Sequence, residues 1–414
     1  MILSDVSAYV TEKTSSADID IENYVTTDSL LQNKNGRKVA QNLPPTICSL
    51  TKFEEGDILL SNIRPYLKKI WKADVSGACS ADVLVFRAKK SHNANYLYSI
   101  LLQDVFFDYV MKAPKGSKMP RGDQGHIMRF PIKSFSAAEE KRIGSLTMNI
   151  MRKLQINNQI NCELLNMAKE LYNYWFLQFD FPDKNGNPYK ASGGKMVYNK
   201  RLKRKIPKGW TVCSIGSVVE SSNGGDWGKD DKTGNYSLCV HCIKGANISA
   251  LTNLTKRYIN KNNSNRLLNE WDIVVEISGG SPVQSTGRSA LITKGLLSRY
   301  DFRLICSNFC QGLKLKEPSI APYFFYMWNM FYDNNIMFNY EGKTSGIKNF
   351  LPDSFMANYW VFPDDKTAQA FGEQIRVLFM LKDKNAEEIS QLSDFRDELL
   401  PLLMNGQVKA RCKI

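Results

Sequence analysis

The sequence has few of the residues that catalytic sites need. Among 414 residues there are only three histidines, His92, His126 and His241, and none has the spacing of a zinc-hydrolase or HNH-type pair. A methyltransferase would need a glycine-rich cofactor loop and an Asn-Pro-Pro-Tyr-like turn, which Leu43-Pro44-Pro45-Thr46 does not supply. The acidic cluster that magnesium requires is approached only by Asp230-Asp231-Lys232, which we interpret as a polar loop. No catalytic site is therefore predicted.

Long apolar runs and a disulfide framework are also missing. No stretch approaches eighteen consecutive apolar residues, and the start, Met1 to Asp5, lacks a signal sequence. The nine cysteines are odd in number and irregularly spaced, which indicates free thiols in a reducing compartment. Cys239-Val240-His241-Cys242 has metal-like spacing, but its only candidate second pair, Cys306 and Cys310, is looser, so free thiols are favoured over zinc. We expect a cytoplasmic protein without membrane contact.

Positive charge is abundant. Lys and Arg number 55 against 41 Asp and Glu, a net charge of +14 that favours a polyanionic partner. Nucleic acid is the leading candidate, and an anionic membrane surface is the rival. Lys190 to Lys208 contains eight basic residues and no acidic one, in a region rich in Gly, Pro and Asn. We interpret 178–209 as a flexible linker, with contact to a DNA backbone as the alternative.

Two long helices are the clearest predicted elements. Residues 136–177 carry an apolar stripe too narrow for a globular core, formed by Ile143, Ile150, Leu154, Leu164, Ala168, Leu171 and Trp175 and interrupted by Asn157 and Asn161. Residues 366–405 carry a similar stripe, formed by Phe371, Ile375, Leu378, Ile389, Leu392, Leu399 and Leu403. We predict that the helices pair antiparallel, with Trp175 near Phe371 and Asn161 opposite Asn385. In the alternative, the asparagines face water or a bound partner.

Short matches in the same order indicate an internal duplication. Leu3–Val6 resembles Ile215–Val218 at an offset of 212 residues, and Asp57-Ile58-Leu59-Leu60 resembles Asp272-Ile273-Val274-Val275 at 215. Further matches are Asn23-Tyr24 with Asn235-Tyr236, Ala94–Tyr98 with Ala321–Phe325, Phe130-Pro131 with Phe362-Pro363, and Glu170-Leu171 with Glu398-Leu399 at an offset of 228. The chain is predicted to be α+β, with two similar mixed α/β domains joined by an antiparallel coiled coil. The predicted boundaries are 1–135, 136–177, 178–209, 210–365, 366–405 and a tail, 406–414.

The predicted chemistry is that of binding. Basic side chains on loops, interleaved with tyrosine and tryptophan, can contact phosphates and position a loop against base edges. The candidate DNA-binding residues are Lys34, Arg37, Lys38, Arg64, Lys68, Lys69, Lys115, Lys118, Arg121, Lys244, Asn247, Arg288, Lys343 and Lys348. Two similar blocks linked by long helices suit the reading of two separated half-sites.

The order of several motifs resembles that of the specificity subunit of type I restriction-modification systems. These motifs are the Gly56-Asp57-Ile58-Leu59-Leu60-Ser61 strand, Lys115-Gly116-Ser117 before Phe130-Pro131, Glu170-Leu171-Tyr172-Asn173-Tyr174-Trp175-Phe176, Ser192-Gly193-Gly194-Lys195-Met196-Val197 and Ile206-Pro207-Lys208-Gly209-Trp210. The resemblance covers nearly the whole chain. It implies two target recognition domains, each reading half of a bipartite site in double-stranded DNA, and helices that hold the partner subunits.

The resemblance also implies a subunit without catalysis, cofactor or metal of its own. Two methyltransferase subunits would use S-adenosylmethionine to methylate adenine, and restriction subunits would use ATP and Mg²⁺. The sequence departs from the family pattern at two places. The first block has no counterpart of Ile206-Pro207-Lys208-Gly209-Trp210 before Leu3, and the second has Gly342–Lys348 where the first has Met119–Asp123. A self-contained nuclease or methyltransferase, and an architectural or RNA-binding protein, remain as alternatives.

Overall fold

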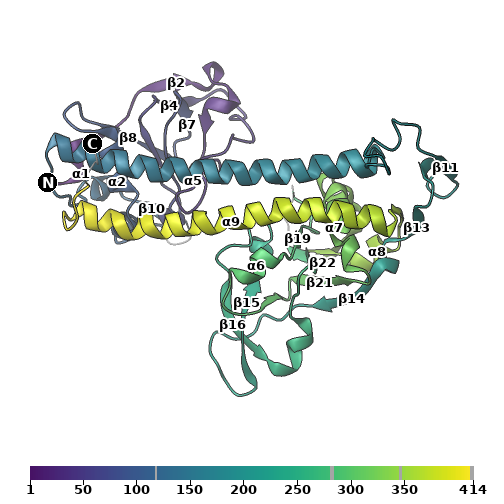
Figure 1. The fold of residues 1–414 in the computed structure, drawn as a ribbon. Helices are drawn as coiled ribbons and strands as arrows, with labels where there is room; N and C mark the ends of the chain where they lie inside the picture. The colour runs from purple at the N-terminus through teal and green to yellow at the C-terminus, as the bar shows by residue number, and fades with distance from the viewer. Residues whose placement is uncertain (117–118, 280–283, 345–346, 411–414) are drawn as a thin grey trace. The chain divides into compact units, whose positions relative to one another are not determined.

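A computed structural model describes residues 1–116, 119–279, 284–344 and 347–410 (Figure 1). The chain divides into two compact units. The first comprises residues 1–158 together with the chain from Glu388 onward, and the second comprises Gln159–Glu387. Each unit therefore combines one β-rich block with part of each long helix, α5 (Ala137–Tyr172) and α9 (Asp365–Met404).

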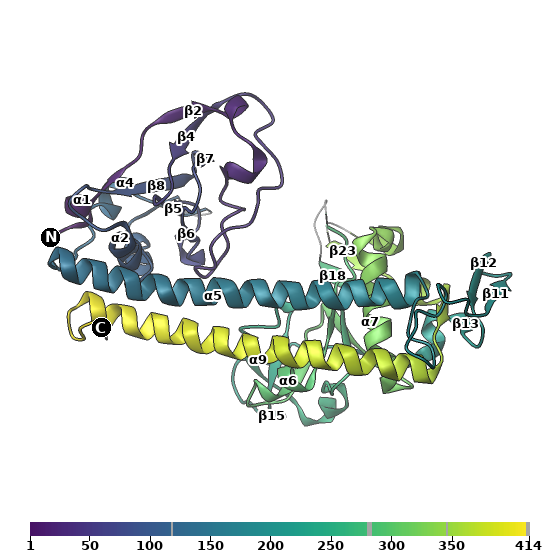
Figure 2. The ribbon, with the colours of Figure 1, turned by 45° about the horizontal axis from the view of Figure 1, so that its top comes forward.

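The β-rich block of the first unit consists mainly of two four-stranded sheets (Figure 2). One sheet has the order β1-β8-β5-β6, with all neighbours antiparallel, and the other has the order β2-β4-β7-β3, in which β3 and β7 are parallel. The strands are β1 (Ser7–Tyr9), β2 (Lys13–Ser15), β3 (Tyr24–Val25), β4 (Ser49–Phe53), β5 (Ile58–Ser61), β6 (Ile70–Lys72), β7 (Gly77–Cys79) and β8 (Val83–Ala88). Helices α2 (Ala94–Leu101) and α3 (Asp104–Val110) supply buried side chains to the same core as the first sheet.

The second unit repeats this plan. Its four-stranded sheet has the order β14-β21-β17-β19, and a three-stranded sheet, β16-β15-β20, contains the parallel pair β15 and β20. The strands are β14 (Val219–Gly224), β15 (Tyr236–Ile243), β16 (Thr255–Asn260), β17 (Ile273–Glu276), β19 (Ser289–Leu291), β20 (Leu304–Cys306) and β21 (Cys310–Leu315). The helices are α6 (Lys294–Ser298), α7 (Ala321–Asp333) and α8 (Pro352–Met356), and β13 (Thr211–Ser214) pairs with β24 (Tyr359–Phe362).

The duplication extends to single backbone conformations at the start of the central strand. In the first unit Gly56 has φ +93°, and Asp57 accepts a hydrogen bond from the Glu54 amide at 2.8 Å. In the second unit, 215 residues later, Trp271 has φ +72° and Asp272 accepts from the Asn269 amide at 2.7 Å. A tryptophan therefore adopts the left-handed conformation that glycine adopts without strain in the first copy. The predicted α+β class with two similar blocks is confirmed.

Several local expectations need correction. Leu3–Val6, expected to be strand-like, forms the short helix α1, and its counterpart Ile215–Val218 is likewise a 3₁₀ turn. The single helix expected from Asn95 to Val110 is interrupted, because Gln103 has an extended backbone with ψ 142° that starts α3 anew. The loop expected from Lys112 to Gly125 contains a short β-hairpin and the helix α4 (Gln124–Ile127).

The linker expected at 178–209 is a folded part of the second unit. Phe179, Phe181 and Ile206 are buried in its main core, together with Trp210 just beyond this segment. The strands β11 (Met196–Asn199) and β12 (Arg204–Pro207) form an antiparallel hairpin. The aromatic anchors explain the difference, because burying a few large side chains can order a polar segment rich in turns.

The two long helices begin at identifiable caps. At the start of α5, Ser136 and Glu139 form a reciprocal capping box, with the Ser136 amide donating to Glu139 Oε2 at 3.0 Å. At the start of α9, Asp364 accepts from the Thr367 amide at 3.0 Å. Helix α5 ends in a π-helical turn, Asn173–Leu177, and α9 includes Pro401 in its last turn.

Within each unit the helices pair in the predicted antiparallel register. In the second unit the rings of Trp175 and Phe371 lie 5.7 Å apart, and Asn385 Nδ2 donates to Asn161 Oδ1 at 2.9 Å. In the first unit Ile143 and Leu403 share one buried core, and the buried Asn157 donates to Glu388 Oε2 at 2.9 Å. The predicted asparagine pair is confirmed, although both its side chains remain partly exposed.

An ion-pair network joins the β-rich block of the first unit to α9. The Lys34 side chain is only 2% exposed, and its Nζ lies 2.6 Å from Asp104 Oδ1 and 2.7 Å from Asp397 Oδ1. Burial raises the pKa values of Asp104 and Asp397, but hydrogen bonds from Lys34 and from Lys68 or Arg396 outweigh it, so both pKa values lie below the ordinary carboxyl value. The two carboxylates are thus held ionised around a buried ammonium group.

We expect this network to respond unequally to the loss of its two signs of charge. The double substitution Asp104→Asn and Asp397→Asn should lower the free energy of unfolding by about 3 kcal/mol, because it leaves the buried Lys34 unpaired. Lys34→Met should cost only about 1 kcal/mol, because both carboxylates reach solvent and retain Lys68 or Arg396. Urea unfolding at pH 7 would measure both values.

The same measurement should depend on pH in one direction. A lowered carboxyl pKa contributes stability above the unfolded value of about 4, and that contribution is lost as the pH falls through the folded pKa. The stability difference between the wild type and the double asparagine variant should therefore shrink below about pH 4. An equal difference at pH 7 and pH 3 would contradict this assignment.

The asparagine pair in the second unit should show measurable coupling. Asn161→Leu or Asn385→Leu alone should each cost about 1 kcal/mol of unfolding free energy, because the remaining amide loses a hydrogen-bond partner. The double leucine variant should recover this loss, since two leucines can pack across the helix pair. A double-mutant cycle in urea measures the coupling, and strict additivity of the two single effects would count against a specific pair.

Candidate nucleic-acid interface

A short β-hairpin follows the central sheet of the first unit. It consists of β9 (Pro114–Lys115) and β10 (Arg121–Gly122), with Arg121 opposite Lys115. The hairpin is attached to the segment that leaves β5, because Ile63 forms a β-bridge with Arg121 and the Arg64 amide donates to the Pro120 carbonyl at 2.8 Å. The basic hairpin is therefore fixed to the buried strand of the sheet.

The second unit contains the equivalent hairpin. Strands β22 (Glu341–Thr344) and β23 (Ile347–Phe350) pair with each other, and β23 pairs with β18 (Ser278–Gly279) just after the central strand β17. The offset of 215 residues relates Ile63 to Ser278, and the offset of 228 relates Arg121 to Asn349. Since Ile63 pairs with Arg121 and Ser278 pairs with Asn349, the two hairpins have the same attachment. Gly342–Lys348 is thus the structural counterpart of the first hairpin.

A surface cavity of about 540 Å³ adjoins the first hairpin. Its polar lining consists of Asn62, Arg121, Asp123 and Gln124, between Gly116, Met119, Gly122 and Gly125. Asn62 Oδ1 is buried and has no hydrogen-bond partner among the described residues. A Cβ atom at Gly122 would lie 3.0 Å from this oxygen, so glycine permits the close approach. Amide and guanidinium groups at one cavity supply both donors and acceptors, as base edges require.

The second hairpin carries charge on a firm support. Lys348 Nζ lies 3.2 Å from Glu341 and 4.6 Å from the centre of the Phe338 ring. Asn349 Oδ1 accepts from Ser278 Oγ at 2.5 Å. Close to the base of this hairpin, the buried Glu276 accepts two hydrogen bonds from Arg288, at 2.6 and 2.9 Å, which raise the pKa of Arg288 above its ordinary value.

Some candidate residues have structural partners. Lys34 is a correction: its ammonium group is buried between two carboxylates and is not available to a phosphate. Lys69 donates to the Thr27 carbonyl at 2.5 Å, and burial lowers its pKa. Arg37 stacks 4.5 Å over Trp71 and donates to the Glu22 carbonyl. Lys68 is partly exposed and pairs with Asp104 at 2.8 Å.

Other candidates in the first unit face solvent. Lys38 and Arg64 are exposed, and Arg64 adopts φ +51° at the turn before Pro65. Arg121 is about half exposed and pairs with Asp82 at 3.0 Å. Lys115 takes part in the backbone pairing of β9, whereas Lys118 lies outside the described residues. These positions gather around the hairpin and the segment that supports it.

The remaining candidates of the second unit differ in availability. Lys244 lies 5.1 Å from the centre of the Trp227 ring and retains partial exposure. The Asn247 amide serves its own turn, because it accepts from the Lys244 amide and donates to the Thr252 carbonyl, both at 3.1 Å. Arg288 is committed to Glu276. Lys343 is opposite Lys348 in the second hairpin.

Sequence reasoning did not identify Asn62, Gln124, Ser278 and Asn349. All four are uncharged, so a search for basic residues on loops passes over them. A usable signal was present in the repeat itself, since the two offsets align Ile63 with Ser278 and Arg121 with Asn349. Applying both offsets to the segments between the matched motifs would have related the two hairpins.

The cysteines form no metal site in the described part of the chain. No group of three or more His, Cys, Asp or Glu side chains in that part is arranged to hold a metal ion. Burial raises the pKa of Cys242 to about 11 and that of Cys310 to about 12, which keeps both as neutral thiols. Among the described helices, none is long and apolar enough to span a membrane.

Comparisons with known proteins agree on one family of relatives. No protein-family model matches the chain. The type I restriction enzyme MjaIX specificity subunit of Methanocaldococcus jannaschii is 23% identical over 370 residues, which are 87% of this chain and 80% of that protein. The EcoDI specificity subunit of Escherichia coli is 29% identical over 92 residues, 22% of this chain and 20% of that protein.

A solved structure shares the fold over nearly the full length. The S subunit of a type I restriction-modification system from M. genitalium is matched with a TM-score of 0.50 and 12% identity, over 98% of this chain and 95% of that one. The order of the two sheets, the two equivalent hairpins and the antiparallel helices are described above. By sequence relationship and fold together, this chain is a homologue of the specificity subunits of type I restriction-modification systems.

Proposed function

We propose that this chain is the non-catalytic DNA-recognition subunit of a type I restriction-modification complex, and that it reads a bipartite site in duplex DNA. The observation that carries the proposal is the repeated attachment of a polar hairpin to the same position of two equivalent sheets. Two copies of one reading device suit a site with two halves. The net charge of +14 supports a polyanionic partner.

Each hairpin would read one half-site. In the first unit, Arg121 and Gln124 border the cavity and can present donors and acceptors to base edges, while Lys38 and Arg64 would contact phosphates. In the second unit, Asn349 and Lys348 occupy the equivalent hairpin. The side chains differ between the units where the backbone attachment is the same, which is what the reading of two different half-sites requires.

The reactions would belong to partner subunits. Two methyltransferase subunits would supply S-adenosylmethionine-dependent adenine methylation, and restriction subunits would supply cleavage with ATP and Mg²⁺. In this division of labour the present chain contributes sequence choice and a scaffold formed by α5 and α9. The related subunits' membership of such systems supports the proposal.

One direct experiment separates recognition from catalysis. The purified chain, incubated with duplex DNA, S-adenosylmethionine and Mg²⁺, should neither methylate nor cleave it, whereas the complex with its partners should methylate a specific site. Methylome sequencing of cells with and without this chain would identify that site. Methylation or cleavage by the chain alone would refute the proposal.

Substitutions in the first hairpin should affect one half-site only. Arg121→Ala combined with Gln124→Ala should relax the choice of bases in one half of the site by about 1–3 kcal/mol, because a bidentate hydrogen bond to a base discriminates by that much. Asn349→Ala should act on the other half. Methylation of a library with both half-sites randomised would report both effects.

A matched control is available in the same unit. Lys52 is exposed to a similar degree as Arg121 and also pairs with a carboxylate, Glu12, at 2.8 Å. Lys52→Ala should leave the site preference unchanged. If the Arg121 variant reads both half-sites like the wild type, its hairpin is not at the DNA.

Exchange of one block should change one half of the site. Replacing residues 210–365 by the same region of a relative with a different site should alter one half-site and preserve the other. The reason is that the two hairpins are supported by separate sheets. Methylome sequencing of the chimaera would measure this, and alteration of both half-sites would exclude independent reading.

A further inference from the structure

We propose that residues 190–208 form a second, sequence-independent DNA contact, which binds the phosphate backbone apart from the two reading hairpins. We call this segment the basic ribbon. The inference rests on the proposed function, because it takes duplex DNA as the partner. It adds a site at a segment that the sequence alone suggested was a flexible linker.

The basic ribbon has a defined backbone. Val197 pairs with Ile206 and Tyr198 with Lys205 in the β11–β12 hairpin, and the Lys208 amide donates to the Lys195 carbonyl at 2.9 Å. Ile206 is buried in the core of the second unit. The ribbon therefore holds its charges in fixed positions on the surface, which reduces the entropy cost when a partner binds.

The arginines of the ribbon anchor it to aromatic side chains. Arg204 lies 5.2 Å from the ring centres of both Phe179 and Trp360, and Arg201 lies 3.4 Å from that of Tyr359. These contacts fix the turn between the two strands against β24. The lysines are thus left as the groups that a partner can neutralise.

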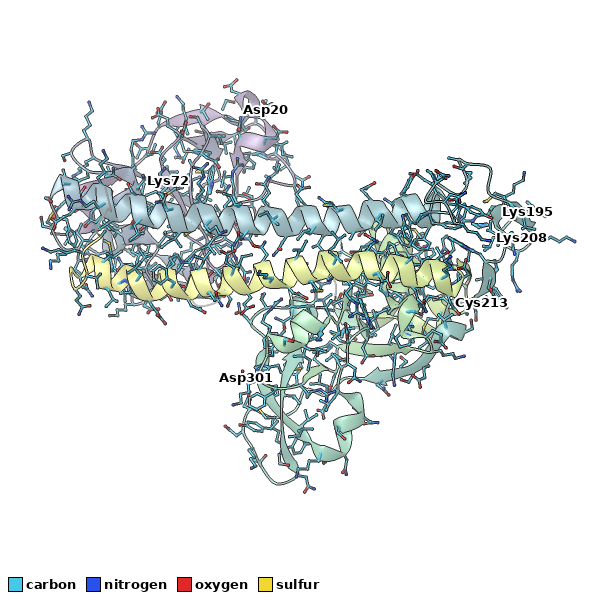
Figure 3. All side chains as sticks on the ribbon, in the orientation of Figure 1. Asp20, Lys72, Lys195, Lys208, Cys213 and Asp301 are labelled. Carbon is cyan, nitrogen blue, oxygen red and sulfur yellow. The ribbon has the colours of Figure 1, made fainter. Side chains whose placement is uncertain are left out.

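Six lysines of the ribbon are exposed, and Figure 3 shows Lys195 and Lys208 on its strands. They are Lys190, Lys195, Lys200, Lys203, Lys205 and Lys208. Within the described part of the chain, none of the six forms an ion pair with a carboxylate. The nearest acids in sequence serve the backbone: Asp180 accepts from the Ala191 amide at 2.7 Å, and Asp183 accepts from the Asn185 amide at 2.8 Å.

The kind of partner follows from this arrangement. Six like charges on one rigid hairpin repel one another, and a partner with regularly spaced negative charges relieves that repulsion. Duplex DNA provides such a row of phosphates, and lysine binds phosphate as a point charge without reading bases. A two-stranded ribbon also has the width that a DNA groove admits. The ribbon would therefore add affinity without sequence preference.

The test compares two sets of lysines with equal charge. In one variant of the full chain, the six ribbon lysines are changed to glutamine. In the control variant, six exposed lysines elsewhere in the second unit are changed to glutamine: Lys232, Lys261, Lys294, Lys316, Lys366 and Lys384. Binding to a fluorescent duplex without the recognition site is measured by anisotropy over a range of salt concentrations.

The ribbon variant should bind this duplex at least about tenfold more weakly at 0.1 M salt, and the slope of log K against log salt should fall by roughly 0.9 for each phosphate that is no longer neutralised. A variant with the six lysines changed to arginine should bind like the wild type. Urea unfolding shows whether the variants are folded. In the assembled complex, the methylated sequence should stay the same, because the ribbon reads no bases.

Other outcomes would overturn the proposal. An equal loss of affinity in the control variant would mean that only total charge matters. Unchanged DNA binding together with failure to assemble with the methyltransferase subunits would assign the ribbon to an acidic protein surface. If the ribbon variant fails to bind while the complex still methylates a bipartite site, the proposed function stands and the ribbon's role is confirmed. If the wild-type complex binds no DNA, both proposals fail.

Discussion

The structure depends on a narrow apolar stripe that α5 and α9 share and that polar side chains interrupt at set places. Leucine and isoleucine alone would pack in several registers of such a stripe, because each heptad resembles the next. The amide pair of Asn161 and Asn385, and the bond from Asn157 to Glu388, are satisfied in one register only. Polar groups thus select the alignment, while the apolar groups supply the free energy of association.

The helices and the duplication were predictable because their signals are local or periodic. A stripe with a period of seven specifies a partner helix, and the regular positions of Asn161 and Asn385 specify how it aligns. The central strands were equally visible, since Asp57-Ile58-Leu59-Leu60 and its copy are turns followed by four buried residues. In these cases one short segment contains the information that its structure requires.

The interface was less predictable because it depends on contacts between distant segments. Lys34 has the sequence context of an exposed loop lysine, and only the approach of Asp397, 363 residues later, makes it a buried partner. The 178–209 segment has the composition of a linker, and its order comes from aromatic side chains that pack into a core formed elsewhere. Asn62 and Asn349 acquire their places through strand pairing, which composition does not reveal.

The division of the chain into its two units has a consequence for its synthesis. The second unit is continuous in sequence, from Gln159 to Glu387, whereas the first needs residues from both ends of the chain. A ribosome releases the second unit complete before the residues that close the first have been made. The N-terminal block must therefore wait, with the Lys34 ammonium group lacking Asp397, until the last helix emerges. Nascent chains stalled before residue 388 would expose that unfinished surface to chaperones.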